Sequence, residues 1–279
     1  MLAALRERGV APDLLVGTSA GALNAAYVAG TGSTADSIEA LGRLWVRTRR
    51  RDVFPIDPVR QMLVLTGRRP SLCSAERLRR LITRSLPYER LQGAATPIYV
   101  TATNVLTGEA VSLHHGDAVS AVLASAAIPA VFPVVEVDGR CLVDGGVADT
   151  GGVARAVALG ADDVWVLPAG YACALRRPPA SALAAALHAV SLLIHQRLLS
   201  EVVTYTDRVD LHVLPPLCPL SVSPIDFSRA AHLIERGHRA AQAWLADEGD
   251  RLPDAGRFLF LHEHSEQSDT VPTASRPAT

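Results

Sequence analysis

Residues 14–25 read Leu-Leu-Val-Gly-Thr-Ser-Ala-Gly-Ala-Leu-Asn-Ala, and this stretch predicts a strand, a sharp turn and a helix in direct succession. The wholly apolar start is typical of a buried strand in a parallel sheet. Gly17 interrupts it, and the small residues 20–29 then favour a helix. Ser19 is therefore expected in the turn between a strand and a helix.

The turn has the GxSxG spacing of a nucleophile elbow, with glycines at Gly17 and Gly21. So sharp a turn predicts crowding two residues on either side of the serine, which only glycine tolerates. The hydroxyl of Ser19 would project from the sheet edge, and the N–H of Ala20 would face a developing oxyanion. The positive end of the following helix dipole would act at the same place.

A serine hydroxyl needs a base to take its proton, and Asp144 is the better candidate. It ends a predicted hairpin strand and is followed by Gly145 and Gly146, which would let the backbone turn away from the carboxylate. Partial burial would raise its pKa from about 3.9 toward working pH. An Asp-Gly turn or a helix-capping carboxylate is the alternative interpretation.

A Ser-Asp-His triad would need one of His188, His195 or His212. In α/β-hydrolases several strands precede the elbow, whereas 16 residues precede Gly17 here. The first two histidines lie seven residues apart on one predicted helix, a spacing that favours a core or interface role.

The rest of the chain predicts strands alternating with helices, typical of an α/β sheet with helical layers on both faces. Two hairpins are expected, one over 97–113 and one over 134–143, the second with an Asp-Gly type I′ turn. A long helix is expected over 180–205. Its apolar stretch is too short to span a membrane, and a core or dimer helix is favoured over a lid or acyl-chain wall.

Composition and charge argue against nucleic-acid binding and leave lipid contact open. The chain has 279 residues, 49% of them hydrophobic and 20% charged, with a net charge of −1 and 5% aromatics. This balance is globular and argues against nucleic-acid binding. The basic residues are all arginine, and the clusters at 47–51 and 77–84 fit solvated faces or contact with anionic lipid equally well.

The four cysteines are widely spaced without CxxC pairing, so neither a metal site nor a disulfide framework is expected. We expect no cofactor and a cytoplasmic protein, with peripheral membrane contact as an open alternative.

Five segments resemble, in order, motifs of the patatin-like phospholipase family. They are residues 15–26 with Asn24, 101–109, 124–133, 142–149 and 158–162. The resemblance covers roughly residues 1–168 and is loose beyond them. It implies a three-layer α/β/α fold with a mostly parallel sheet.

The resemblance also implies a reaction: hydrolysis of acyl esters of phospholipids or lysophospholipids through an acyl-enzyme, with Ser19 as nucleophile and Asp144 as base. The implied domain covers residues 1–262, with its motifs in 1–168 and a helical part in 169–250. A disordered tail is expected over 263–279.

Two departures from the family pattern matter. The glycine-rich loop that supplies oxyanion amides is not found, and residues 1–5 match the helix that follows it. We therefore expect the first strand and the oxyanion loop upstream of Met1. Residues 149–152 read Asp-Thr-Gly-Gly in place of Asp-Asn-x-Pro.

The departures leave a second interpretation open, in which the chain is a catalytically weak lipid-binding or interaction protein. A third interpretation is a malonyl-type acyltransferase. Such enzymes carry histidine directly before the serine, whereas this chain has Thr18.

Overall fold

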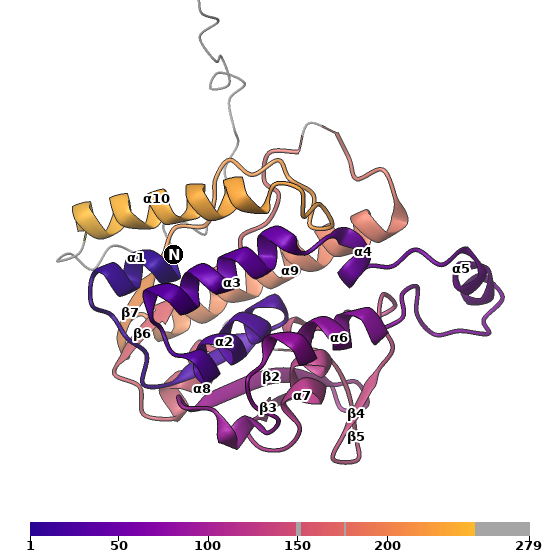
Figure 1. Cartoon of the computed structure of the whole chain (residues 1–279), viewed down its shortest axis with the longest axis horizontal. Helices are drawn as coiled ribbons and strands as arrows, with labels where there is room; N and C mark the ends of the chain where they lie inside the picture. Colours follow the sequence, from indigo (N-terminus) through magenta and orange to yellow (C-terminus); the bar gives the residue numbers. More distant parts are fainter. Residues whose placement is uncertain (149–151, 176, 249–279) are drawn as a thin grey trace, which may run out of the picture.

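The computed structural model describes residues 1–148, 152–175 and 177–248. The described chain is a mixed α/β protein with a central sheet and flanking helices, as predicted (Figure 1). The strands are β1 Leu15–Thr18, β2 Ile98–Asn104, β3 Ala110–Leu113, β4 Val135–Val137, β5 Arg140–Asp144, β6 Asp163–Val166 and β7 Asp210–Val213. The helices are α1 Leu2–Glu7, α2 Ala20–Thr31, α3 Ala35–Arg47, α4 Arg50–Val53, α5 Pro58–Leu65, α6 Glu76–Ser85, α7 Ala118–Ser125, α8 Val153–Ala158, α9 Ala182–Tyr205 and α10 Ala230–Glu248, with 3-10 turns η1 Leu91–Gly93 and η2 Gly145–Val147.

The main sheet has the order β1-β2-β5-β4, with β3 also paired to β2. It is parallel where β1 runs beside β2, and antiparallel in the β2–β3 and β4–β5 pairs and where β5 joins β2. Strands β6 and β7 form a separate parallel pair. Among the described strands, β1 is paired with β2 alone, and the strand expected upstream of Met1 stays a prediction.

Both predicted hairpins are confirmed. In the second, Asp138 and Gly139 have φ of 50° and 71°, the two positive values that a type I′ turn requires. Strand β7 was not predicted. Its four residues give too short an apolar alternation, and its partner β6 lies more than forty residues earlier in the chain.

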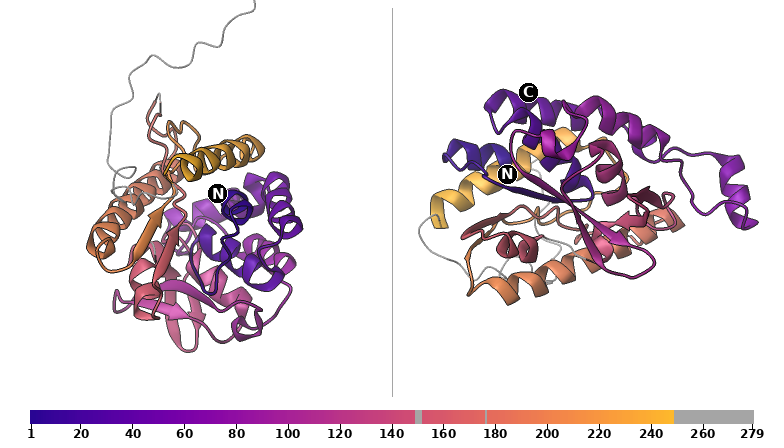
Figure 2. Two further views of the ribbon diagram at one scale, coloured as in Figure 1. Left: turned by 90° about the vertical axis from the view of Figure 1, so that its left-hand side faces the viewer. Right: turned by 90° about the horizontal axis from the view of Figure 1, so that it is seen from below.

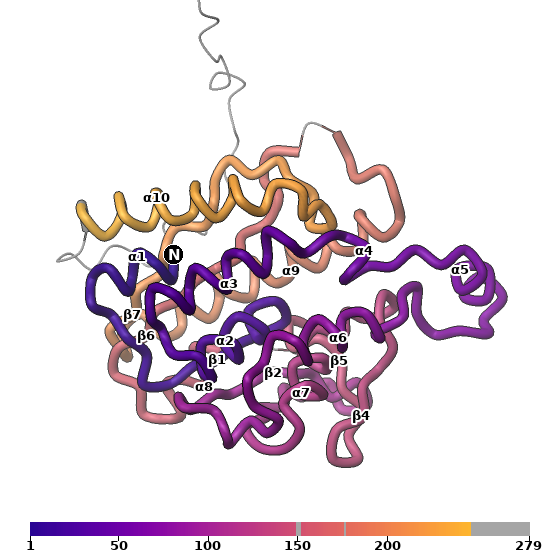
Figure 3. Tube along the Cα trace, in the orientation of Figure 1, coloured from indigo at the N-terminus to yellow at the C-terminus, as the bar shows by residue number. Residues whose placement is uncertain are grey.

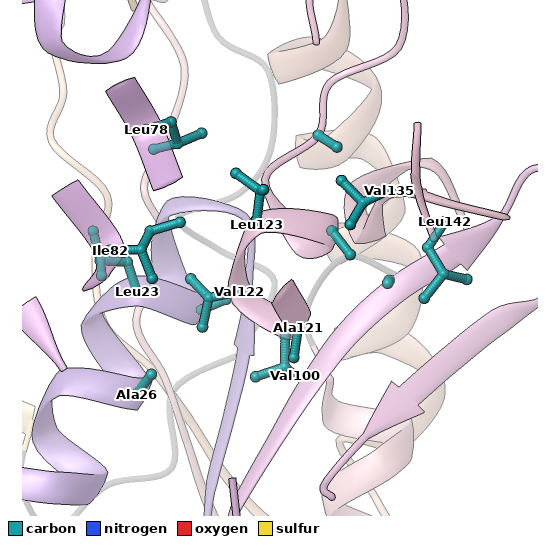
Figure 4. Packing of buried hydrophobic residues seen from close by; sticks show 14 of the residues in the cluster. Leu23, Ala26, Leu78, Ile82, Val100, Ala121, Val122, Leu123, Val135 and Leu142 are labelled. Atoms are coloured by element: carbon teal, nitrogen blue, oxygen red, sulfur yellow. The ribbon is translucent and has the colours of Figure 1, made fainter. Parts of the chain in front are cut away.

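The core explains why the helices cover both faces of β1. Leu15 packs with the largest buried cluster, which α2, α6 and α7 build against β2 (Figure 4). The next residue, Val16, packs with a second cluster between α8, α9 and the β6–β7 pair. Successive side chains of a strand point to opposite faces, so a helical layer lies on each side.

The two ends of the described chain pack together. Helix α10 lies along α1 (Figure 1; Figure 2, left), where Ala4 and Leu5 contact Ala241, Trp244 and Leu245. The C-terminal helical part therefore belongs to the same folded body as the elbow. The predicted domain end at residue 262 and the predicted tail over 263–279 lie outside the described residues.

Helix α9 corrects one expectation. It runs for 24 residues and is long and apolar enough to cross a membrane by length and composition, whereas its apolar stretch was predicted to be too short. The prediction failed because it considered only the apolar residues up to Ile194. The helix continues through the polar residues 195–197 to Tyr205. Leu187, Leu198 and Val202 are nevertheless buried, so this helix packs on the domain.

Helix α5 stands apart from the body, at the end of a long excursion between α4 and α6 (Figure 3). None of its residues is buried.

Candidate active site

Ser19 occupies the predicted turn, directly after β1 and as the residue that precedes α2. Its backbone has φ 56° and ψ −124°, a region that non-glycine residues rarely enter. Such a conformation costs on the order of 1–3 kcal/mol and persists only where the surrounding structure enforces it. The elbow geometry expected from the sequence is present.

Glycine is required on one side of the serine only. A Cβ at Gly17 would lie 2.7 Å from the Cα of Ala22 and 2.9 Å from the Cβ of Ala25, because β1 and α2 pack closely there. A Cβ at Gly21 would meet no atom within 4 Å outside its own helix turn. The prediction that crowding requires both glycines is therefore wrong for Gly21, which lies on the exposed first turn of α2.

The structure brings Ser19 and Asp144 together from opposite parts of the chain. The Ser19 hydroxyl donates a hydrogen bond of 2.7 Å to Oδ2 of Asp144. The other carboxylate oxygen, Oδ1, accepts the N–H of Gly146 at 2.8 Å. One carboxylate thus fits both interpretations that the sequence left open: it caps the turn η2, and it accepts the hydrogen bond of the serine hydroxyl.

Burial sets the proton affinity of Asp144. The side chain is 1% exposed, and loss of solvent raises the pKa of this carboxyl from 3.8 to about 6. The hydrogen bonds from Ser19 and Gly146 act in the opposite direction, because they stabilise the charged form, but they do not outweigh burial. A carboxylate with this pKa is ionised at neutral pH and is a stronger base than an ordinary aspartate.

The main chain of Asp144 is fixed on both sides. Its N–H donates to the carbonyl of Ala127 at 2.9 Å. Its carbonyl accepts the hydroxyl of buried Thr103 at 2.9 Å, and the same hydroxyl oxygen accepts the N–H of Ala148 at 3.1 Å. Thr103 therefore ties together the two ends of the turn that follows Asp144.

The two glycines after Asp144 are needed for close approach. A Cβ at Gly145 would lie 2.3 Å from the carbonyl oxygen of Thr101, which is main chain and cannot rotate away. A Cβ at Gly146 would lie 2.6 Å from Cδ1 of Ile194 on α9. The turn is thus packed between β2 and α9. The Asp149-Thr-Gly-Gly departure begins at residues 149–151, outside the described residues.

Ser125 is a site residue whose role the sequence did not reveal. It is fully buried at the end of α7, and its Oγ accepts the N–H of Ser19 at 2.9 Å. It stands in the segment 124–133 that resembles a family motif, yet no local pattern connects it to a residue 106 positions earlier.

Ala20 and Gly21 are exposed at the start of α2. The first N–H groups of a helix have no acceptor within the helix and carry its positive dipole end. This end adjoins the Ser19 hydroxyl. Ala20 as oxyanion donor remains a prediction.

The candidate histidines lie elsewhere. His195 is buried on α9, with its ring 4.6 Å from that of Tyr171. His212 on β7 stacks on Trp165 at 4.1 Å. Nδ1 of His188 is buried and has no hydrogen-bond partner among the described residues. Because the serine hydroxyl donates directly to the aspartate, no imidazole stands between the two groups.

The described residues include no group of three His, Cys, Asp or Glu side chains arranged to hold a metal ion. The structure does bring two cysteines together, which their spacing in the sequence did not suggest. The sulfurs of Cys173 and Cys218 lie 3.9 Å apart, longer than a disulfide bond.

Comparison with known proteins places this site in a family context. The family model described as Patatin-like phospholipase matches residues 1–157, the part that contains both Ser19 and Asp144. Curated relatives include uncharacterised NTE family proteins of Mycobacterium bovis and of two strains of Mycobacterium tuberculosis. Each is 31% identical over 156 residues, which cover 53% of this chain and 38% of the relative. The match thus takes in well under half the length of these relatives.

Proposed function

Since the chain belongs to the patatin-like phospholipase family, we propose that it is a serine-dependent hydrolase of acyl esters in phospholipids or lysophospholipids. The observation that carries the proposal is the 2.7 Å hydrogen bond from the Ser19 hydroxyl, held in a strained elbow, to the buried carboxylate of Asp144. The lipid class of the substrate rests on the family.

In the first half of the proposed reaction, Ser19 Oγ attacks the carbonyl carbon of the ester as Asp144 Oδ2 takes the hydroxyl proton. The negative charge that develops on the carbonyl oxygen is stabilised by the N–H of Ala20 and the N-terminal end of α2. Asp144 then gives the proton to the departing alcohol oxygen. An acyl ester on Ser19 remains.

In the second half, water replaces the alcohol. Asp144 takes a proton from the water molecule, which attacks the acyl carbon, and Ser19 leaves with the proton restored to its oxygen. The fatty acid is released. A base of pKa about 6 suits both halves, because it is free of its proton at neutral pH and still binds one firmly enough to act.

The fixed positions of Ser19 and Asp144 contribute to the proposed rate, in addition to the basicity of Asp144. Ser125 fixes the Ser19 amide, and Thr103 and Ala127 fix the main chain of Asp144. Both reacting groups are therefore in place before substrate binds, which reduces the entropy lost in the transition state.

Release of fatty acid from phosphatidylcholine and lysophosphatidylcholine tests the proposal. Ser19→Ala should lower the rate at least about thousandfold, since the nucleophile is lost. Thr31→Ala, which removes a hydroxyl at the far end of α2, is the matched control and should retain the rate of the unaltered protein. Equal rates for the unaltered protein and Ser19→Ala would instead favour the alternative hypothesis of a catalytically weak lipid-binding or interaction protein. The predicted cytoplasmic location is part of this proposal.

A further inference from the structure

The excursion that carries α5 has an apolar stripe facing solvent. We call residues 56–69 the arm; it projects from the body in two perpendicular views (Figure 1; Figure 2, right). Its four most exposed large apolar side chains recur every third residue and are between 61% and 82% exposed: Ile56, Val59, Met62 and Leu65. Spacing of three places side chains near one another on a helix surface.

The helix of the arm is well formed but has little tertiary support. Arg60 ties it to buried Ser71, donating from Nε to the carbonyl at 2.8 Å and from Nη2 to Oγ at 2.7 Å. Asp57 caps it by accepting the N–H of Arg60, and Pro58 stands at its first position, a favourable start. None of its residues is buried, and isolated helices of this length are marginal in water. An apolar surface of this kind is typical of a segment that binds a partner.

The charge around the stripe indicates the nature of that partner. Residues 49–69 contain six arginines and two aspartates, a local charge of +4 on a chain of net charge −1. Both aspartates are already engaged as helix caps, Asp52 by the N–H of Arg49 and Asp57 by that of Arg60. Arg68 and Arg69, which follow the helix, are exposed.

The base of the arm is fixed to the segment that holds Asp144. Phe54 stacks on Phe132 with ring centres 5.6 Å apart, before the arm begins. After the arm ends, the N–H of Leu72 donates to Ala130 at 2.9 Å, and that of Cys73 to Val131 at 2.8 Å. Residues 130–132 begin three residues after Ala127, whose carbonyl accepts the N–H of Asp144. The arm is thus attached to the chain close to Ala127, whose carbonyl holds the main chain of Asp144.

We propose that the arm is a docking element for anionic lipid bilayers, with its apolar stripe at the acyl-chain boundary and its arginines among the headgroups. A helix with an apolar face and basic flanks binds membranes in this manner. A second copy of the chain fits less well, because two arms, each with three arginines and one aspartate, would repel each other. The inference rests on the proposed function, since a lipid hydrolase must reach substrate in a membrane.

Co-sedimentation with vesicles tests the inference. Every protein compared also carries Ser19→Ala, the background protein, so that the vesicle lipids are not hydrolysed during the measurement. Vesicles of phosphatidylcholine alone are compared with vesicles that also contain phosphatidylglycerol. The double change Met62→Ser with Leu65→Ser should weaken binding to the anionic vesicles at least about tenfold. Arg68→Gln with Arg69→Gln should weaken it about fivefold per arginine at low salt, and much less at high salt.

Ile234→Ser is the matched control, since it removes an exposed apolar side chain from α10, away from the arm. It should bind as the background protein does. Binding that is equal for the arm variants and this control would overturn the inference. Absence of binding to anionic vesicles would also overturn it. The same holds if light scattering shows a dimer that the Met62 and Leu65 changes dissociate.

A soluble short-chain ester separates this inference from the proposed function. With Ser19 restored, the arm variants should hydrolyse that ester at the unaltered rate while losing activity on anionic vesicles. No hydrolysis of either substrate by the unaltered protein would contradict the proposed function and leave the vesicle-binding result to decide the inference alone.

Discussion

The amide of Ser19 is held by the side chain of Ser125, whose Oγ accepts its hydrogen bond at 2.9 Å. The contact joins the elbow to the end of α7, and the segment after α7 holds the N–H of Asp144 through Ala127. Both members of the proposed dyad therefore depend on the same eight-residue helix and its C-terminal end.

Ser125→Ala should reduce activity without abolishing it. The change leaves the Ser19 N–H without its acceptor, and an unsatisfied buried donor costs about 1–3 kcal/mol. We expect kcat to fall about 10–100-fold, with KM for a soluble ester little changed. Ser120→Ala, on the same helix, is the matched control. Equal kcat for the two variants would show that Ser125 does not position the elbow.

Activity should depend on the ionisation of Asp144. The pKa of this carboxyl is raised to about 6 by burial, and only the charged form can take the proton of Ser19. For a soluble ester, kcat/KM should rise tenfold per pH unit below 6 and level off above it. An inflection near the ordinary aspartate pKa of about 4 would contradict the assignment of Asp144 as base.

Asp144→Asn should abolish activity yet stabilise the fold at neutral pH. The folded-state pKa lies above the unfolded value, so the folded protein binds the proton more tightly, and its stability falls as pH rises from about 4 to about 6. Asparagine does not ionise and avoids this loss, which is on the order of 2–3 kcal/mol.

Thermal unfolding of both proteins across this pH range measures the effect. The Tm of Asp144→Asn relative to the unaltered protein should increase between pH 4 and pH 6 and then stay constant. A difference in Tm that does not vary with pH would mean that the carboxylate is not destabilised by burial.

The two elbow glycines should respond differently to alanine. Gly17→Ala places a Cβ against the main chain of α2 and should lower stability by several kcal/mol or prevent folding. Gly21→Ala meets open space on an exposed helix turn and should be neutral or stabilising by up to about 1 kcal/mol. Denaturant unfolding compares the two; similar losses would refute the one-sided crowding at the elbow.

Much of the local structure around the site was predictable because its determinants are short in range. The apolar residues 14–16, the glycine after them and the small residues of α2 specify strand, turn and helix within one continuous segment. The Asp138-Gly139 pair likewise specifies its hairpin turn. Each of these elements is encoded by neighbours in the sequence.

The features that the sequence did not reveal depend on contacts between distant segments. Ser125 reaches Ser19 across 106 residues, and Thr103 reaches the turn after Asp144 across 41. Strand β7 depends on its parallel partner more than on its own four residues. The open space beside Gly21 could not be foreseen either, since crowding at a glycine depends on what the fold places next to it.

Reaction with a fluorophosphonate probe, followed by mass spectrometry of the modified peptide, tests the central claim most directly. We predict a single adduct on Ser19, formed at a rate that rises with pH through about 6, and lost in both Ser19→Ala and Asp144→Asn. Labelling of other serines alone, or labelling of Ser19 at the same rate in Asp144→Asn, would contradict a nucleophile activated by this aspartate.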